Sequence, residues 1–396
     1  MDPLILSAYT LVSALGRGLD ATCAALRERR SGLRPCDFLD AALNTWIGRV
    51  DGVEQVTLPQ PLDHFDCRNN RLAYLGLGQD GFAERVAAAR VRHGAGRIGV
   101  VVGTSTSGIL ETELAYRARD PDSGELPAGF SYQYAHNTYS VADFTRRLLA
   151  LEGPALAVST ACSSSSKAFA SGYRLIAAGL CDAVVVGGVD SLCLTTLLGF
   201  SALELVSDRP CRPADRRRNG ISIGEAAGFA LLERPLPGMA GIALLGYGES
   251  TDAYHMSSPH PEGLGARLAM ASALERAGIA PGGIDYVNLH GTATRSNDAA
   301  EDKAVTALFG NRVPASSIKG WTGHTLGAAG IANAIATCLS IRDGFVPVSL
   351  NTVEVDPELQ GWIALEPLQR PLSHAVSNAF GFGGNNVSLV FGKVGP

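Results

Sequence analysis

The stretch PALAVSTACSSSSKAFASGYRLIAAG, residues 154–179, joins two different patterns with one cysteine between them. Its first part, 154–161, is small and apolar and predicts a buried strand, whereas the part from Ser163 onward predicts a helix rich in Ala, Gly and Ser. Cys162 falls at the junction. A strand that leads through a tight turn into a helix is a building unit of α/β proteins, so this stretch indicates a fold class and a candidate site together.

Other segments repeat this alternation along the chain. Runs rich in β-branched residues predict strands at 97–105, 154–161, 181–191, 226–233, 282–294, 313–321 and 374–392. The run at 226–233 follows a long loop rather than a helix, which predicts an antiparallel strand. We therefore predict an α/β fold.

The two halves of the chain share one pattern. In the second half, SSIKGWTGH (316–324) leads into TLGAAGIANAIATCLSIRDG (325–344), as the Cys162 turn leads into its own helix. Both helices are apolar nearly all round, which predicts that they are buried. We expect sheets layered with helices between and outside them, in two halves that span residues 1–240 and 241–396.

Composition excludes several classes of protein. The 396 residues carry a formal net charge of −5 at pH 7, which is not the basic footprint of a nucleic-acid-binding protein. The sequence has no run of eighteen apolar residues and no signal-peptide pattern, so we expect no membrane span. The eight cysteines are scattered and none forms C-x-x-C, so disulfide staples are not indicated. We expect a cytoplasmic protein.

Cys162 is the first candidate for chemistry. Unpaired N–H groups and the dipole at a helix N-terminus favour an anion, so this position should lower the pKa of the thiol and make it a nucleophile. The small residues around it leave room for a substrate. The alternative is an inert, buried cysteine in a polar turn.

Two histidines are the next candidates. His290 ends the predicted strand of 282–294 and should point into the crevice where α/β folds bind ligands. His324 holds the place in the second half that Cys162 holds in the first, with Lys319 five residues before it at the end of its strand. The alternatives are a histidine satisfied in the core, a helix-capping histidine and a surface lysine.

The segment NAFGFGGNN, 378–386, is rich in glycine and precedes the last predicted strand. It indicates a tight turn whose backbone N–H groups face a developing oxyanion, with a phosphate cradle as the alternative. The two histidines are far apart in sequence and no local ligand cluster surrounds them. We therefore expect neither a metal nor a cofactor.

Six ordered segments resemble the elongating β-ketoacyl-ACP synthases of the thiolase-fold superfamily. They are LVSALGRGLDATCAALRERRSGLRP (11–35), STACSSSS (159–166), CRPADRRRNGISIGEAAG (211–228), HGTATRSNDAAE (290–301), IKGWTGHTLGAAG (318–330) and NAFGFGGNN (378–386). The resemblance implies an α/β, thiolase-like layered αβαβα fold made of two similar halves. It also implies decarboxylative condensation of a cysteine-bound acyl group with malonyl-ACP, which gives β-ketoacyl-ACP.

The resemblance assigns roles to matching positions. Cys162 would accept the acyl group, and His290 and His324 would serve decarboxylation and condensation. Lys319 would form a charged pair with Glu301 that orders the site. The other supporting residues implied are Asp298 and Phe382. The residues implied to contact substrate are Thr106, Tyr132, Thr292, Thr294, Phe380 and Gly383.

Phe382 has a special place in this assignment. It resembles the gate residue of the family, whose backbone N–H joins that of Cys162 in an oxyanion hole. The same position excludes a thiolase, since thiolases carry a second cysteine in this Gly-rich motif. Initiating ketosynthases use Asn where His324 stands.

The partners implied are acyl carrier protein, in its acyl and malonyl forms, and a second subunit. That subunit would form a homodimer, or a heterodimer with a related ketosynthase-like chain. Carrier proteins are typically acidic, so we expect basic residues at the pocket mouth, with Arg216–Arg218 as candidates. No metal or organic cofactor is implied.

Some positions depart from the family pattern. The usual GEGAG is GEAAG at 224–228, and the usual RDG is RNG at 218–220. Thr106 stands where a bulky apolar residue often limits the acyl pocket, and the loop 130–139 holds three tyrosines. In sequence these motifs resemble ketosynthases of aryl polyene pathways more than fatty-acid enzymes. The pathway and the native acyl chain stay open. A non-catalytic chain-length-factor-like subunit, a non-decarboxylating acyltransferase and a cysteine hydrolase are the alternative functions.

Overall fold

The computed structural model describes residues 1–236 and 238–395. Over these residues, twelve strands form one main sheet. Its order is β14-β12-β11-β16-β17-β10-β1-β9-β7-β5-β6, with β2 paired to β1. The predicted α/β class is confirmed.

One half of the sheet is built from the first part of the chain. From the edge inward it holds β6 (Ala155–Val158), β5 (Ile98–Gly103), β7 (Ala183–Asp190), β9 (Ala226–Glu233) and β1 (Leu4–Ser13), with β2 (Gly16–Arg17) beside β1. Strands β6, β5 and β7 are parallel, and β9 runs antiparallel to both β7 and β1. The antiparallel strand predicted after the long loop is therefore confirmed.

The other half repeats this arrangement. From the edge inward it holds β14 (Trp362–Ile363), β12 (Pro314–Ser316), β11 (Tyr286–Asn288), β16 (His374–Gly381), β17 (Asn385–Val394) and β10 (Gly241–Thr251). Strands β12, β11 and β16 are parallel, and β17 runs antiparallel to both β16 and β10. The two halves meet where β1 pairs with β10 through two residue pairs, Leu4↔Leu244 and Ile5↔Ala243.

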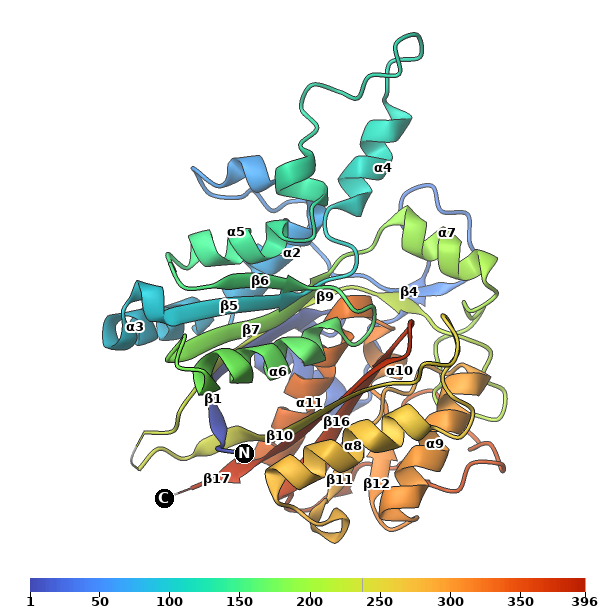
Figure 1. Ribbon diagram of the computed structural model, residues 1–396. Helices are drawn as coiled ribbons and strands as arrows, with labels where there is room; N and C mark the ends of the chain where they lie inside the picture. The colour runs from blue at the N-terminus through green and yellow to red at the C-terminus, as the bar shows by residue number, and fades with distance from the viewer. Residues whose placement is uncertain (237, 396) are drawn as a thin grey trace.

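Helices form the layers on both sides of each half-sheet. The two small-residue helices, α6 (Ser164–Ala177) and α11 (Ala329–Asp343), pack together between the half-sheets in one apolar core (Figure 1). The outer face of the first half is covered by α2 (Arg68–Leu77), α3 (Phe82–His93) and α5 (Ser140–Leu148). The outer face of the second half is covered by α8 (Leu264–Ala277) and α9 (Arg295–Phe309). This is the layered, two-halved fold that the sequence predicts.

Smaller elements complete the described chain. The helices are α1 (Gly18–Glu28), α4 (Ile109–Arg117), α7 (Leu194–Ala202) and α10 (Lys319–Thr322). Single turns lie at η1 (Asp63–Phe65), η2 (Ala95–Arg97), η3 (Tyr132–His136), η4 (Pro281–Gly283) and η5 (Leu326–Ala328). Two small sheets hold β3 (Arg34–Pro35), β4 (Trp46–Gly48) and β8 (Ile223–Gly224), and β13 (Phe345–Val346) and β15 (Leu368–Gln369). The loop after α4 projects from the body of the molecule (Figure 1).

Three details differ from the sequence predictions. The strand predicted over 313–321 ends at Ser316, so Lys319 does not end a strand but begins the short helix α10. The segment 374–392 is a hairpin of two strands around the Gly-rich turn. Strand β11 ends at Asn288, two residues before His290. Among the helices of residues 1–236 and 238–395, none has the length and apolar character needed to cross a membrane.

Candidate active site

The Cys162 turn joins β6 to α6. Ala161 adopts a positive φ of 50°, which bends the chain sharply just before the cysteine. The Ser164 hydroxyl donates to the Ala161 carbonyl at 2.5 Å and accepts from the Thr160 N–H at 2.9 Å, so the turn is tied to the first residue of the helix. The predicted position of the thiol at a helix N-terminus is confirmed.

His290 lies in the loop between β11 and α9, and its backbone is held from two sides. The Glu301 carboxylate accepts the N–H groups of His290 and Gly291, each at 2.8 Å. The Lys319 ammonium donates to the His290 carbonyl and lies 3.4 Å from Nδ1 of the ring. Because Nδ1 faces this donor, Nε2 carries the proton of the neutral ring.

His324 lies between α10 and η5. Its N–H donates to the Ser222 carbonyl at 2.7 Å, and its carbonyl accepts from the Gly224 N–H at 2.9 Å. Ring Nδ1 accepts the Leu326 N–H at 3.1 Å. The proton of this neutral ring is therefore also on Nε2.

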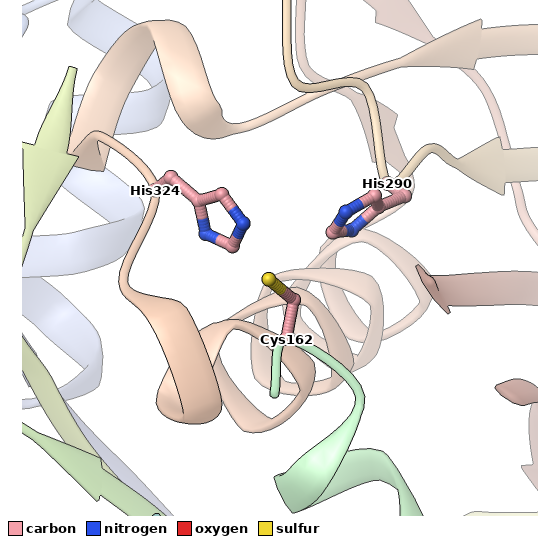
Figure 2. Close-up of side chains that lie close together, drawn as sticks. All are labelled: Cys162, His290 and His324. Atoms are coloured by element: carbon pink, nitrogen blue, oxygen red, sulfur yellow. The ribbon is translucent and has the colours of Figure 1, made fainter. Parts of the chain in front are cut away.

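These three side chains come together although they are distant in sequence. The Cys162 sulfur and one nitrogen of each histidine lie within 4.8 Å of one another. Figure 2 shows the sulfur pointing toward both rings, whose centroids are 5.4 Å apart. All three line one cavity of about 60 Å³. The arrangement offers one nucleophile and two hydrogen-bond donors to a single bound group.

Burial sets the protonation states here. It raises the pKa of the Cys162 thiol to about 11, although the charge of Lys319 and backbone N–H groups of Phe382 and Cys162 lower it. The expectation that the helix N-terminus lowers this pKa is therefore wrong in direction, because removal from water outweighs the local donors. Burial and the Lys319 charge hold the pKa values of His290 and His324 well below 6.5, so both rings are neutral donors.

The comparisons with known proteins agree with this geometry. Residues 77–236 match the beta-ketoacyl synthase N-terminal domain, and residues 242–353 match the beta-ketoacyl synthase C-terminal domain. The chain is 31% identical over 418 residues to the 3-oxoacyl-[acyl-carrier-protein] synthase 2 of Mycobacterium tuberculosis, a match that covers 98% of this chain and 97% of that one.

The chain belongs to the beta-ketoacyl synthase family. The synthase is also 31% identical over 442 residues to the chloroplastic 3-oxoacyl-[acyl-carrier-protein] synthase I of Hordeum vulgare, covering 99% of this chain and 89% of that one. Among solved structures it resembles the ketosynthase ApeO in complex with its chain length factor ApeC from Xenorhabdus doucetiae. That match has a TM-score of 0.89 and 40% identity and covers 99% of this chain and 98% of the other. The ishigamide ketosynthase/chain length factor matches with a TM-score of 0.87 and 26% identity over 100% of both chains.

Family membership confirms the predicted enzyme class, an acyltransferase of the thiolase fold. With all three triad residues in place, the synthase has the machinery of a catalytic ketosynthase. The roles of individual residues stay predictions, and the structure gives their positions.

Several residues expected to contact substrate line the cavity. They are Thr292, Thr294 and Phe380, together with the gate candidate Phe382. Gly383 is not among the lining residues: it follows Phe382 in the tight turn between β16 and β17, with a φ of +83° that favours glycine. Thr106 and Tyr132 are not among the residues that line this cavity: Thr106 is buried against Asp190, and Tyr132 is 61% exposed.

Glu301 and Lys319 are both buried and both hold His290. Within the described residues no oxygen of Glu301 lies within 4.0 Å of the Lys319 ammonium, so the two do not form a direct ion pair. Instead, Glu301 accepts the backbone N–H of His290, and Lys319 donates to the backbone carbonyl of His290. Burial raises the pKa of Glu301 to about 7 and lowers that of Lys319. Asp298 accepts the N–H groups of Ala214 and Ala293, which ties the 207–220 loop to the site.

The predicted basic patch is corrected in part. Arg218 is buried, with its side chain 3% exposed, and pairs with Asp356 and Asp298, so it cannot meet a partner. Arg216 is exposed but pairs with Glu354. Arg217 is exposed and has no ion pair among the residues that the structure describes. The run of three arginines therefore offers one unpaired surface charge.

Two groups near the site were not predicted from the sequence. Phe200 of α7 lines the cavity and its ring lies 5.8 Å from that of Phe382. Asp190, the last residue of β7, accepts hydrogen bonds from both halves of the molecule.

The triad itself has the donor set of a zinc site, so a divalent metal would compete with substrate for the Cys162 sulfur.

Proposed function

We propose that the synthase extends acyl chains by decarboxylative condensation, with Cys162 as the acyl-carrying nucleophile. The observation that carries the proposal is the meeting of the Cys162 sulfur with the two neutral imidazoles in one cavity. In the first step the sulfur attacks the thioester of an acyl-ACP. The new C–S bond forms as the carrier's C–S bond breaks, and the thiol proton goes to the departing carrier sulfur.

The backbone N–H groups of Cys162 and Phe382 would stabilise the oxyanion formed in this step. Both N–H groups act on the Cys162 sulfur, since they lower the pKa of the thiol. Fixed donors aimed at a developing oxyanion cost no reorganisation during the reaction. The close approach of Gly381 to the Thr160 carbonyl, where an added Cβ would lie at 2.7 Å, brings the Gly-rich turn to this position.

The second step would use the histidines. The Nε2–H groups of His290 and His324 donate to the thioester oxygen of malonyl-ACP as the C–C bond to carbon dioxide breaks. The electron pair of that bond forms the enolate, which attacks the acyl carbonyl on Cys162. A new C–C bond forms as the C–S bond to Cys162 breaks, and β-ketoacyl-ACP leaves. The sulfur departs as a thiolate and takes a proton from water, which restores the thiol for the next cycle. Because the pKa values of both rings lie well below 6.5, the rings are neutral at physiological pH and each can donate its Nε2–H.

Carrier docking would rely on exposed arginines around the cavity mouth. Arg295 is exposed beside the lining residues Thr294 and Ser296, and Arg209 and Arg217 are exposed on the 207–220 loop. Such charges attract an acidic carrier and are screened by salt. We expect Arg217→Ala or Arg295→Ala to weaken carrier affinity by about two- to fivefold, and the difference to vanish in about 1 M salt.

A second subunit would pair with the β6 edge of the sheet. Strand β6 has a free edge in the described chain and carries Leu156, which is 43% exposed. No charged residue or proline within Ala155–Val158 blunts this edge, and an unblunted edge is a template for another strand. The likeness to ApeO, which is solved with its chain length factor, favours a related but non-identical partner.

The same likeness favours a pathway other than housekeeping fatty-acid synthesis, such as an aryl polyene pathway. A cytoplasmic setting and a boundary between the halves near residue 240 stay predictions. A non-catalytic chain-length-factor-like role is the alternative, and the intact triad argues against it.

Intact-mass spectrometry tests the proposal directly. The synthase mixed with acyl-ACP should gain one acyl mass, and the Cys162→Ala variant should not. Modification at another cysteine, or no modification of correctly folded wild-type protein, would contradict the assignment. Native mass spectrometry of the chain alone would contradict the heterodimer if it found a stable and active homodimer.

A further inference from the structure

Asp190 is a buried carboxylate at the carboxyl end of β7. Its oxygens accept six hydrogen bonds, and within the described residues no Lys, Arg or His nitrogen lies within ion-pair distance of it. A charged group this deep is costly unless every lone pair is used, and here neutral donors use them. So many bonds on one carboxylate indicate that it holds other segments in place.

The bonds come from two separate segments. Oxygen Oδ1 accepts from the backbone N–H groups of Ser105 and Thr106, at 2.8 and 2.9 Å, and from the hydroxyls of Thr104 and Thr106. Oxygen Oδ2 accepts the Gly327 N–H at 2.5 Å and the Ser105 hydroxyl. Residues 104–106 follow β5 in the first half, whereas Gly327 belongs to η5 in the second half. Asp190 therefore joins the two halves next to the active site.

Gly327 is held on both sides of its peptide. Its carbonyl accepts the hydroxyl of Ser165 at 2.6 Å, and Ser165 lies in α6, three residues after Cys162. A Cβ added to Gly327 would lie 2.8 Å from Oδ2 of Asp190 and 2.9 Å from the Ser105 nitrogen. Only glycine permits this close approach, so the segment before α11 is fixed against the first half.

The residue before Gly327 is strained. Leu326 has a φ of 51°, a left-handed conformation that costs a branched residue about 1–2 kcal/mol. In this conformation its N–H donates to Nδ1 of His324 at 3.1 Å. Strain of this kind persists only where the surroundings hold it, and the anchored Gly327 peptide is its immediate neighbour.

We propose that Asp190 is a positioning residue for His324: it anchors Gly327, keeps Leu326 left-handed, and so holds the His324 ring with its Nε2–H aimed into the cavity. This inference rests on the proposed role of His324 as a donor in decarboxylation. It assigns to a β7 carboxylate of the first half the control of a donor in the second half.

The geometry requires a carboxylate rather than an amide. The Ser105 and Thr106 N–H groups face Oδ1, and the Gly327 N–H faces Oδ2. An asparagine has one oxygen and one NH₂ group, so on one of these sides its NH₂ would face a backbone N–H and no hydrogen bond could form. We expect its oxygen to face the two N–H groups and its NH₂ to face Gly327. Asp190→Asn would therefore release Gly327 with little change in volume.

The test measures the two half-reactions of Asp190→Asn separately. Acyl loading, followed by intact mass, should stay within about threefold of wild type. The negative charge of Asp190 raises the pKa of the Cys162 thiol, so its loss in Asp190→Asn should not slow acyl loading. Carbon dioxide release from malonyl-ACP should fall by about 10- to 100-fold, part of the effect of losing a whole donor. Nitrogen NMR of labelled histidine should show His324 as a mixture of tautomers instead of the Nε2–H form.

Two controls make the result decisive. Val185→Ala removes buried side-chain volume in the same strand without touching Asp190, so it reports what lost stability alone does to both rates. His324→Ala reports whether this ring serves decarboxylation at all. If His324→Ala slows carbon dioxide release and Asp190→Asn does not, the inference is wrong and the proposed function stands. If His324→Ala has no effect, the proposed function fails first.

Equal losses of loading and decarboxylation in Asp190→Asn would also overturn the inference, since they indicate a structural role. Should this variant fail to fold, Ser105→Ala decides, because it removes only the hydroxyl that bonds Oδ2 and lies 3.3 Å from the Gly327 nitrogen. We expect it to slow carbon dioxide release severalfold at unchanged loading. Unchanged release would contradict the inference.

Discussion

The turn after β6 and the turn after β12 occupy equivalent places in the two halves and do different chemistry. In the first half, Cys162 follows β6 directly through a sharp turn at Ala161. In the second half, the helical turn α10 is inserted between β12 and His324, and it carries Lys319 into the interior. One topology thus delivers a thiol from one side and a set of basic groups from the other.

This difference teaches how a repeated fold divides a two-step reaction. The first half supplies the nucleophile and a polar turn, whereas the second half supplies both imidazoles, the buried ammonium and the Glu301 carboxylate. Acyl transfer should therefore depend mainly on the first half, and decarboxylation mainly on the second. The groups shared by both halves, Asp190 above all, should couple the steps.

The largest expected effect is in the first half. Cys162→Ala should lower condensation by more than about 10³-fold, because no acyl-enzyme can form. Intact mass after incubation with acyl-ACP measures the loss. Cys211→Ala is a matched control, since this buried thiol lies outside the cavity lining. Persistent acylation of Cys162→Ala would contradict the claim that the first half supplies the nucleophile through Cys162.

The second effect concerns the other half. His324→Ala should lower carbon dioxide release from malonyl-ACP by about 10²–10³-fold, the cost of one oxyanion donor, while acyl loading onto Cys162 stays within a few-fold of wild type. His374→Ala, a partly buried histidine at the start of β16, should change neither rate. A His324→Ala variant that condenses normally would return His324 to a capping role.

Lys319 should link the two halves through its charge. This charge lowers the pKa of the Cys162 thiol, which burial holds at about 11. Lys319→Met should raise that pKa further, so alkylation of Cys162 by iodoacetamide at pH 8 should slow by up to about tenfold. In the wild type the alkylation rate should keep rising to about pH 11. A plateau near pH 8.5 would show that the thiol is exposed to solvent.

The buried histidines and the Cys162 thiol should also contribute opposite slopes to the pH dependence of stability. The folded pKa values of His290 and His324 lie well below 6.5, so the unfolded chain binds protons that the folded one does not, and the stability contributed by these two rings falls as pH drops below 6.5. Glu301, with its pKa raised to about 7, contributes in the opposite direction between about pH 7 and 4.5 and offsets part of this slope. The folded pKa of Cys162 lies above its ordinary value of 9.0, so the unfolded chain loses its proton first and stability falls between about pH 9 and 11.

Each group contributes at most about 1.4 kcal/mol per pH unit. Urea unfolding at pH 5.5, 7.5 and 10 measures both slopes. Cys162→Ala should leave the acid slope unchanged and flatten only part of the alkaline slope, since burial also raises the pKa of Cys67, Cys193, Cys211 and Cys338. His324→Gln should flatten part of the acid slope. If Cys162→Ala changes the acid slope instead, the assignment of the two slopes is wrong.

The fold and the triad could be predicted from the sequence because each reacting residue stands at a strand-to-helix junction. The junctions at Cys162 and His324 also repeat, which relates the two halves before any contact is known. The same reasoning predicts the antiparallel strand β9 and the buried helices α6 and α11, since both rest on local composition.

Other features depend on burial, which local sequence does not determine. The pKa of the Cys162 thiol moves opposite to expectation because the whole fold excludes water from it. Arg218 lies in a run of three arginines, a residue type that is usually exposed, yet the loop buries it against Asp298 and Asp356. Asp190 lies in the segment predicted as a strand over 181–191, and its hydrogen-bond partners come from residues 104–106 and Gly327, which only the tertiary fold brings to it.

Carbon dioxide release from malonyl-ACP by Cys162→Ala tests the division between the halves most directly. The account predicts release within about tenfold of wild type, because the two histidine donors remain and no thiol takes part in that step. Release could even be faster if the vacated space resembles the acylated site. A loss as deep as that of His324→Ala, in protein that unfolds normally in urea, would contradict the account and place the thiol within the decarboxylation machinery.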